Sequence, residues 1–330
     1  MLSYMEHDDI TYLNIDKQNI YLLSSLPSRL VELYCGNNNL SRLPALPHTL
    51  RALNCPHNRL TRLPELPALT VLDITANHIV QLHVPETLNK LYCSFNPGLS
   101  LSLPNALKEL HCCNNDLTSL LLPPRIEIVY CSYNKLTSVA LPEGLKQFYC
   151  DNNSLKRLDL PASLQVLDCV DNQLTALALP PHLEELNCSY NQITSITLNK
   201  ALIHVNLSAN PIVSVPTLHR GIVFLNLNHT RIEKCFDFGL ICSVYFYGTP
   251  LYTKMNAVLQ TQRLDKNMIR LSFEMITMIE GRFRELYYGF KIKARMMAWM
   301  WKARENIARR KYHPDELWKL IHDYDVLDRW

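Results

Sequence analysis

Residues 30–44 read Leu-Val-Glu-Leu-Tyr-Cys-Gly-Asn-Asn-Asn-Leu-Ser-Arg-Leu-Pro, and residues 50–64 repeat this pattern as Leu-Arg-Ala-Leu-Asn-Cys-Pro-His-Asn-Arg-Leu-Thr-Arg-Leu-Pro. The shared unit is L-x-x-L-x-C-x-x-N-x-L-x-x-L-P, and its second apolar position recurs every 19 or 20 residues. A fixed period of this length indicates stacked structural repeats. The thirteen occupants of that position are Leu13, Leu33, Leu53, Leu72, Leu91, Leu110, Val129, Phe148, Leu167, Leu186, Val205, Leu225 and Val244.

The unit itself predicts the local structure. The alternating x-L-x-C segment favours a short strand with Leu and Cys facing inward. A single copy is too small to bury this face, so neighbouring copies must stack and pair in parallel, about 4.8 Å apart. The recurrent Asn supplies an amide for backbone groups at the turn, and the prolines favour extended rather than helical connections. The first and last copies are atypical, as expected for capping repeats, with Gln18, Thr230 and Thr249 in place of Asn.

The cysteines follow the same period. Eight of the eleven occupy one repeat position, which elsewhere holds Ile, Leu or Phe, so we expect a buried ladder of free thiols and no disulfide scaffold. Such a ladder favours a reducing compartment, and we expect a cytoplasmic protein, in a host cytosol or a virion if it derives from a pathogen. No C-x-x-C pair is present, so we expect no structural zinc. The eight are Cys35, Cys55, Cys93, Cys112, Cys131, Cys150, Cys169 and Cys188.

The composition divides the chain near residue 250. The 330 residues fit about two domains. Residues 1–250 carry 17 basic and 20 acidic groups, whereas residues 251–330 carry 16 basic and 10 acidic groups. Of the 57 leucines, 50 lie at or before residue 251. We therefore expect a repeat domain over 1–250 and a basic helical domain over 251–330, the latter covering the open end of the stack. With only 8 glycines, glycine-rich phosphate loops are not an organising feature, and we expect no cofactor and no small-molecule substrate.

The repeats resemble leucine-rich repeat proteins. The short period and the L-P-x-L-P connections at 43–47 and 63–67 are similar to the short-repeat class of bacterial effectors, with YopM- and IpaH-type repeats. This resemblance covers residues 10–251 and implies an α/β solenoid, a horseshoe of about thirteen repeats. The helical spacing of apolar residues after Leu251 adds a helical C-terminal cap to this expectation. The resemblance also implies a non-catalytic, effector-like role in protein–protein interaction.

The same resemblance raises an enzymatic alternative. The ligases of this class use a Cys-x-Asp nucleophile motif, and the chain contains Cys235-Phe236-Asp237. Here the motif lies between the last two repeats, and the residues that follow are fewer than the ligase domain requires. We therefore expect no enzyme, and an E3 ubiquitin ligase-like activity through Cys235 stays an alternative.

Repeat positions beside the buried strand residues should face the hollow of the solenoid. Between residues 92 and 149 these positions are rich in aromatic side chains, and carboxylates follow directly after them. Exposed tyrosines beside acids are typical of a binding hot spot, although Tyr also simply suits an exposed strand. We expect a protein or peptide partner with a basic portion. The predicted protein-binding residues are Tyr92, Phe95, His111, Tyr130, Tyr133, Tyr149, Asp151, Asp168, Asp171 and Glu185.

The C-terminal part suggests a second surface. Residues 282–311 hold ten basic and two acidic groups around an apolar helical stripe that includes Trp299. Such a helix could contact an acidic protein or, as weaker alternatives, a membrane surface or nucleic acid. Residues 308–317 also resemble basic Y-H-P tails on repeat proteins of large DNA viruses, which implies a structural or assembly role, for example in a virus particle, held through the tail. The candidate tail contacts are Lys291, Lys293, Arg295, Lys302, Arg309, Arg310 and Lys311.

Overall fold

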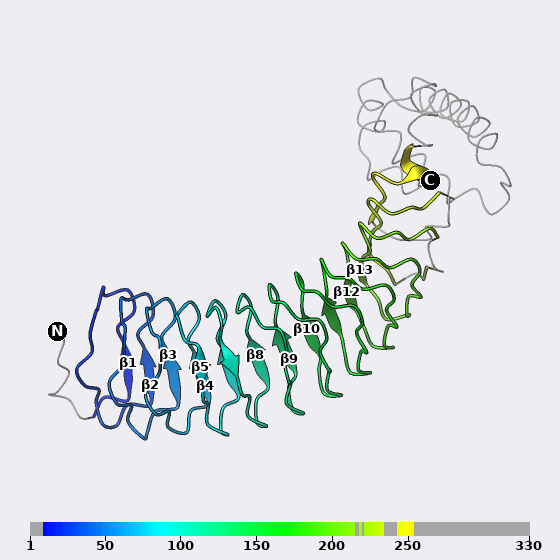
Figure 1. Ribbon diagram of the computed structural model, residues 1–330. Helices are drawn as coiled ribbons and strands as arrows, with labels where there is room; N and C mark the ends of the chain where they lie inside the picture. The colour runs from blue at the N-terminus through cyan, green and yellow to red at the C-terminus, as the bar shows by residue number, and fades with distance from the viewer. Residues whose placement is uncertain (1–8, 215–217, 220, 234–242, 254–330) are drawn as a thin grey trace, which may run out of the picture. The chain divides into compact units, whose positions relative to one another are not determined.

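The computed structural model describes residues 9–214, 218, 219, 221–233 and 243–253. Thirteen short strands of these residues form one parallel sheet in chain order, and β5 and β7 form a separate pair (Figure 1). The strands are β1 (Tyr12–Asn14), β2 (Glu32–Tyr34), β3 (Ala52–Asn54), β4 (Val71–Asp73), β5 (Gln81–Leu82), β6 (Lys90–Tyr92), β7 (Ser100–Leu101), β8 (Glu109–His111), β9 (Ile128–Tyr130), β10 (Gln147–Tyr149), β11 (Val166–Asp168), β12 (Glu185–Asn187), β13 (His204–Asn206), β14 (Phe224–Asn226) and β15 (Ser243–Tyr245).

The strands of the main sheet from β1 to β14 each bury their middle residue and leave its neighbours more accessible, whereas the middle residue of β15, Val244, is only partly buried. In β9 the buried residue is Val129, which is paired in register with Leu110 of β8 and Phe148 of β10. The register therefore stacks the apolar position that recurs every 19 or 20 residues into one continuous column. This confirms the predicted parallel solenoid.

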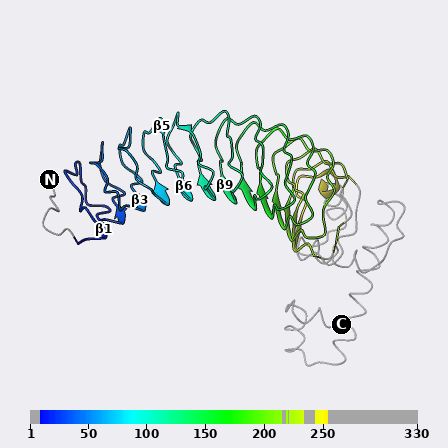
Figure 2. The ribbon, with the colours of Figure 1, turned by 90° about the horizontal axis from the view of Figure 1, so that it is seen from below.

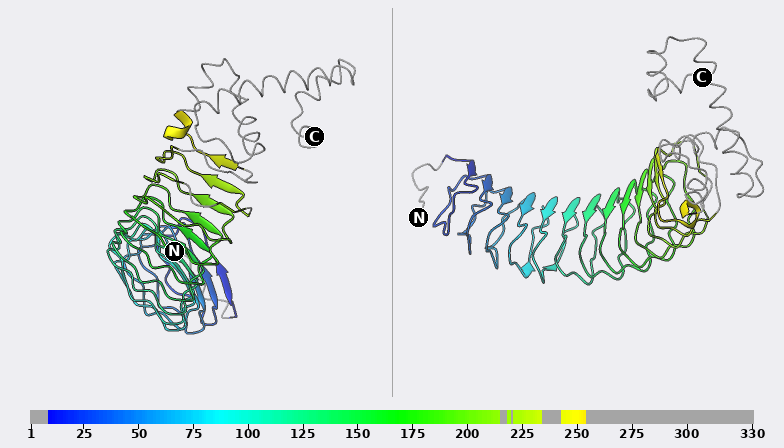
Figure 3. Two further views of the ribbon diagram at one scale, coloured as in Figure 1. Left: turned by 90° about the vertical axis from the view of Figure 1, so that its right-hand side faces the viewer. Right: turned by 90° about the horizontal axis from the view of Figure 1, so that it is seen from above.

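The main sheet lines the concave side of the described solenoid, and the return segments form its convex side (Figures 2 and 3). These return segments contain no helix between the described residues 9 and 233. The β5–β7 pair lies on the convex side and was not expected from the repeat (Figure 2). The turn before β7 is one residue longer than in the adjacent repeats, and Gly98 adopts a φ of 80° there. This turn precedes Ser100, whose N–H donates to the carbonyl oxygen of Val80 at 2.9 Å.

The recurrent Asn side chains connect successive coils. The Nδ2 of Asn96 donates to the carbonyl oxygens of Ile74, at 3.0 Å, and Cys93, at 3.1 Å, and its Oδ1 accepts from the N–H of Ile79 at 3.0 Å. One amide thus serves backbone groups of two coils, which confirms the role predicted for this position. In the atypical last coils, Thr230 Oγ1 donates only within its own coil, to the carbonyl oxygen of Leu227 at 2.8 Å.

The cysteine ladder is buried and unbridged. All eight ladder cysteines have 0% exposure, and none of the nine cysteines among the described residues forms a disulfide. Burial raises the pKa of ladder thiols such as Cys131 well above its ordinary value. The ladder therefore behaves as a column of small apolar side chains, as predicted. The ninth, Cys113, is half-buried and lies one residue past the ladder position.

A helix begins at Pro250 and is described as far as residue 253. Proline suits the first turn of a helix because its missing N–H would have no intrahelical partner there. The rest of the predicted helical cap, from residue 254 on, lies outside the described residues, as do all seven candidate basic contacts and Cys235. Within the described residues, no helix is long and apolar enough to cross a membrane.

Candidate protein-binding surface

Four aromatic side chains form a continuous stack on the concave sheet. They come from the last residue of β6, β8, β9 and β10, which the parallel register places side by side. The ring centroids of Tyr92 and His111 lie 4.6 Å apart, those of His111 and Tyr130 4.3 Å apart, and those of Tyr130 and Tyr149 4.2 Å apart. The last pair is parallel within 3°. These distances approach the spacing of about 4.8 Å between strands, so the sheet itself sets the stack. We call these four residues the aromatic ladder.

Glu109 holds the first end of the aromatic ladder in place, and its own charge is compensated by Lys90. Its Oε1 accepts a hydrogen bond from the Tyr92 hydroxyl at 2.9 Å and lies 3.1 Å from His111 Nε2, while Oε2 lies 2.8 Å from Lys90 Nζ. Burial acts to raise the pKa of Glu109, but the hydrogen bonds from Lys90, Tyr92 and His111 outweigh it, and the net shift is downward. Burial lowers the pKa of His111, although its contact with Glu109 acts in the opposite direction. Burial and the bond to Glu109 raise the pKa of Tyr92 to about 12.

Carboxylates surround the other end. Asp168 follows Tyr149 in the same column, because β10 and β11 pair these two residues in register. Its Oδ1 accepts from the N–H of Val170 at 3.3 Å and its Oδ2 from Asn187 Nδ2 at 3.2 Å. Burial raises the pKa of Asp168 despite these bonds. Burial, the hydrogen bond with Tyr130 and the nearby charges of Glu185 and Asp168 raise the pKa of Tyr149 to about 12.

The acids at this end have no strong cationic partner. Among the described residues, no Lys or Arg nitrogen lies within 4.0 Å of the carboxylates of Asp151, Asp168, Asp171 or Glu185. Glu185 has only the His204 ring, at 3.9 Å. Asp151 instead accepts a short hydrogen bond from the Ser132 hydroxyl. The two ends of the aromatic ladder therefore differ in charge compensation.

Three of the predicted residues, Phe95, Tyr133 and Asp171, lie in the turns after the strands and not in the sheet. Their backbones are left-handed, with φ values of 58°, 55° and 50°. Phe95 is 53% exposed and Tyr133 55% exposed, in contrast to the half-buried ladder rings. Phe95 and Tyr133 line a shared hollow of about 490 Å³ together with His78, Pro97 and Asp116, which the repeat pattern did not single out. Of the ten predicted residues, five thus share the last strand position and three lie along the turns, while Glu185 is the first residue of β12 and Asp151 lies two residues past the end of β10.

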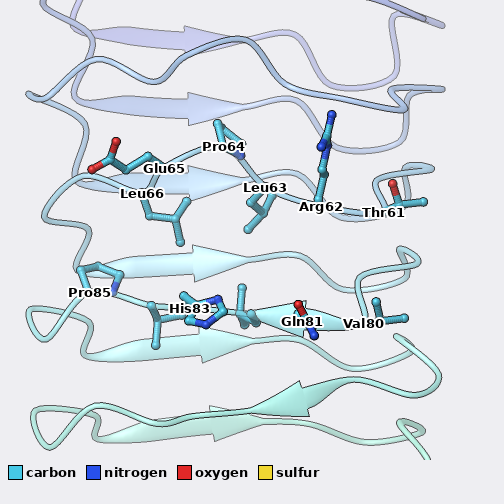
Figure 4. A pocket seen from close by; sticks show the side chains of 12 residues that line it. Thr61, Arg62, Leu63, Pro64, Glu65, Leu66, Val80, Gln81, His83 and Pro85 are labelled. Atoms are coloured by element: carbon cyan, nitrogen blue, oxygen red, sulfur yellow. The ribbon is translucent and has the colours of Figure 1, made fainter.

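A larger hollow of about 640 Å³ lies on the convex side, between the return segments 61–66 and 80–85 (Figure 4). Its walls are mostly apolar and include Leu63, Pro64 and Val80, while the charged groups of Arg62 and Glu65 extend away from one another. None of the ten predicted residues lines it. No group of three or more His, Cys, Asp or Glu side chains suited to a metal ion occurs in the described part of the chain.

The partners of the aromatic ladder could have been found from the repeat register. Lys90 and Glu109 occupy the same strand position in successive coils, so opposite charges meet when the strands pair. Opposite charges at neighbouring positions of paired strands stabilise the pairing. Cys113, Ser132 and Asp151 likewise share one position in three consecutive repeats.

Comparison with solved structures identifies the architecture. YopM from Yersinia pestis, a leucine-rich effector protein, aligns with a TM-score of 0.63 and 25% identity over 73% of this chain and 84% of that one. This is the leucine-rich repeat fold. InlJ from Listeria monocytogenes, whose functional domain includes a cysteine ladder, aligns with a TM-score of 0.56 and 25% identity over 68% of this chain and 60% of that one. A leucine-rich repeat protein from Leptospira interrogans aligns with a TM-score of 0.59 and 22% identity over 73% of each chain.

The chain is a leucine-rich repeat protein that resembles bacterial effectors, as the L-P-x-L-P connections predicted. No family model matches the sequence, and no curated protein matches it in sequence. The likeness to YopM therefore rests on the three-dimensional repeat together with 25% identity.

Proposed function

We propose that this protein is a non-catalytic, effector-like interaction module whose protein partner binds along the concave sheet and its adjoining turns. The observation that carries the proposal is the exposure of Phe95 and Tyr133 at left-handed turn positions. The left-handed conformation costs an ordinary side chain about 1–2 kcal/mol, and Asn or Asp tolerates it best. Other coils of this solenoid place Asn at the same position, as in Asn114 and Asn152.

The turn geometry therefore does not require an aromatic residue. Phe95 and Tyr133 also leave more than half of their surface exposed, so burial within the chain recovers little of the conformational cost. A partner that covers these rings would supply the missing burial. Aromatic side chains of this kind carry much of the binding free energy at protein interfaces.

The aromatic ladder extends this surface into the sheet. Its four rings are held in place by stacking and, at one end, by Glu109, so little conformational freedom is lost when a partner binds. The effector-like part of the proposal is supported by the likeness to YopM, which is described as an effector protein.

The chemistry of the same surface favours binding over catalysis. Among the nine described cysteines, Cys113 is the one that is only half-buried, and burial raises its pKa despite hydrogen bonds from Ser132. A nucleophilic cysteine needs a lowered pKa or an adjacent base. Cys113 has neither among the interactions of the described residues.

Affinity purification with matched variants tests the proposal. The tagged full chain is compared with Tyr130→Ala/Tyr149→Ala, with Phe95→Ala/Tyr133→Ala and with Tyr21→Ala as an exposed aromatic control outside the strands. We expect both double variants to lose specific partners that the control retains, with circular dichroism unchanged. Retention of every partner by both double variants would refute concave-face binding.

The tail and the compartment belong to the same proposal. We propose that residues 251–330 form a separate basic helical domain that caps the repeats, and that the protein acts in a cytosol. Deletion of residues 282–330 should then leave partner capture intact. Loss of capture with the repeats still folded would instead favour a structural or assembly role through the tail. A ubiquitin thioester that disappears in Cys235→Ala would show ligase chemistry and refute the non-catalytic assignment.

A further inference from the structure

The place where the aromatic ladder meets the carboxylates differs from the rest of the concave surface. We propose that this junction, formed by Tyr149 and Asp168, binds an arginine side chain in an extended, basic segment of the partner protein. The inference rests on the proposed function and adds the chemistry of the partner. It commits to a cationic peptide because both the ring and the acids at the junction favour a cation.

The ring geometry provides the first argument. One face of Tyr149 is covered by Tyr130, which lies parallel to it at 4.2 Å. Along the column the next side chain on the opposite side is Asp168. A phenol ring attracts a cation within about 6 Å of its centroid, and a carboxylate beside the ring adds a charge-assisted hydrogen bond. A guanidinium placed over this end of the stack can contact both groups together.

The contrast between the two ends of the aromatic ladder provides the second argument. At the Tyr92 end, Glu109 is paired with Lys90 at 2.8 Å and is fully compensated. At the Tyr149 end, Asp168 is half-buried and receives only neutral donors, from Val170 and Asn187. Burial raises the pKa of Asp168, whereas the pKa of Glu109 is lowered. The carboxylate at the junction therefore lacks the counter-charge that the same type of group has at the other end.

The surrounding charge has the same sign. Asp151, Asp171 and Glu185 lie in the coils that adjoin the junction, and none has a Lys or Arg partner within 4.0 Å among the described residues. The whole chain carries a net charge of +3. Binding of a cationic peptide must therefore depend on this local group of carboxylates, because the net charge of the whole chain opposes it.

Arginine fits the junction better than lysine. Its planar guanidinium stacks on an aromatic ring and presents a fork of donors to a carboxylate, whereas the lysine ammonium is a compact, strongly hydrated charge. Side chains on one face of an extended chain recur about every 6.6–6.8 Å, whereas neighbouring strands of the sheet lie about 4.8 Å apart. An extended segment that runs along the sheet therefore spans several coils, without a one-to-one match between its side chains and the coils.

Fluorescence anisotropy with designed peptides tests the inference. The probe is a fluorescein-labelled 12-residue peptide of alternating Ser and Arg, and the matched peptides replace Arg by Lys or by neutral citrulline. We expect the full-length protein to bind the Arg peptide at least tenfold more tightly than the citrulline peptide, with the Lys peptide between them. Binding should weaken with added salt, since exposed charge interactions are screened.

Matched variants locate the site. Asp168→Asn and Tyr149→Ala should each weaken Arg-peptide binding at least fivefold, whereas Tyr149→Phe, which keeps the ring, should bind within twofold of the parent. The controls are Asp159→Asn, an exposed acid paired with Arg157, and Tyr21→Ala, and both should bind within twofold. Thermal melting checks that each variant is folded. If Tyr149→Ala unfolds, Asp168→Asn still tests the site, because it keeps the size of the side chain.

The outcomes separate this inference from the proposed function. Equal binding of the Arg and citrulline peptides, or equal losses in Asp168→Asn and Asp159→Asn, would overturn the arginine site. If Tyr130→Ala/Tyr149→Ala also loses its purified partners, concave binding stands and only the partner chemistry is wrong. If both double variants keep every partner, the proposed function fails whatever the peptides show.

Discussion

Replacement of Asn134 by Ala should test how the coils are held together. Asn134 Oδ1 accepts from the N–H of Leu117 at 2.9 Å and from the N–H of Asn115 at 3.2 Å. Its Nδ2 donates to the carbonyl oxygens of Cys112, at 2.9 Å, and Cys131, at 3.0 Å. All of these groups are buried in the turn column of the solenoid.

The magnitude follows from which groups lose their partner. Each of the two carbonyls keeps a second donor, since Asn115 Nδ2 also reaches the Cys112 oxygen and Asn153 Nδ2 the Cys131 oxygen. The N–H groups of Leu117 and Asn115 have no second acceptor among the hydrogen bonds of the described residues. A buried donor left without a partner costs about 1–3 kcal/mol, so two of them predict a loss of about 2–6 kcal/mol in the free energy of unfolding.

Urea unfolding followed by circular dichroism measures this loss, with Asn105→Ala as the control because Asn105 is exposed in the turn before β8. Asn134→Thr should recover only part of the loss. A threonine hydroxyl can donate to its own coil, as Thr230 does, but it is too short to accept from Leu117 in the preceding coil. A loss below about 0.5 kcal/mol for Asn134→Ala, the range of ordinary surface substitutions, would refute the assigned role of the amide.

Three further predictions concern the turn residues, the aromatic ladder and the thiols. Tyr133→Asn should raise the free energy of unfolding by about 0.5 kcal/mol in urea, because Asn tolerates the left-handed backbone better, and a clear loss would contradict the strain argument. Since the pKa values of Tyr92 and Tyr149 are raised to about 12, stability should be fully present below pH 10 and decline as the pH rises from 10 through 12. Thermal melting between pH 10 and 12 should show a smaller decline in stability for Tyr92→Phe/Tyr149→Phe than for the parent protein. An equal decline in both proteins would count against the raised pKa values. Cys131→Ser buries a hydroxyl in the ladder and should cost about 1–3 kcal/mol, and ladder thiols should react with a thiol reagent only on unfolding. Rapid labelling of native Cys131 would show that the ladder is open to solvent.

The periodic part of the sequence predicts most of this fold because each repeat position has a single structural task. Val129, Phe148 and Leu167 occupy one position and become one buried column once the strands pair. The Asn and Cys positions are also constrained, since the first supplies an amide to backbone groups of two coils and the second holds a buried apolar side chain. The β5–β7 pair escaped prediction because it depends on one extra residue in the Pro97–Gly98 turn, which leaves the period almost unchanged.

The candidate surface is less predictable because residue types alone do not give geometry. The pattern placed Phe95 and Tyr92 in one aromatic cluster, but the left-handed turn separates Phe95 from the sheet. Glu109 and Asp168 differ in charge compensation because the neighbouring coil supplies the cation Lys90 to Glu109 but only the neutral amide Asn187 to Asp168. That difference becomes visible only when successive coils are aligned position by position.

The accessible strand positions are distinct from the positions that build the scaffold. The last strand residues Tyr92, His111, Tyr130, Tyr149 and Asp168 form one column, separate from the buried Leu, Cys and Asn columns. Substitution of a ring in that column alters the surface of the sheet while the hydrogen bonds of the buried Asn side chains remain, whereas substitution of Asp168 also affects its bond with the N–H of Val170. Because the register brings successive members within 4.2–4.6 Å in the aromatic ladder, each substitution also changes the packing of its neighbours. In the proposed binding mode, recognition therefore depends on runs of consecutive coils, and loss of one ring in the middle of the run should weaken binding at both of its ends.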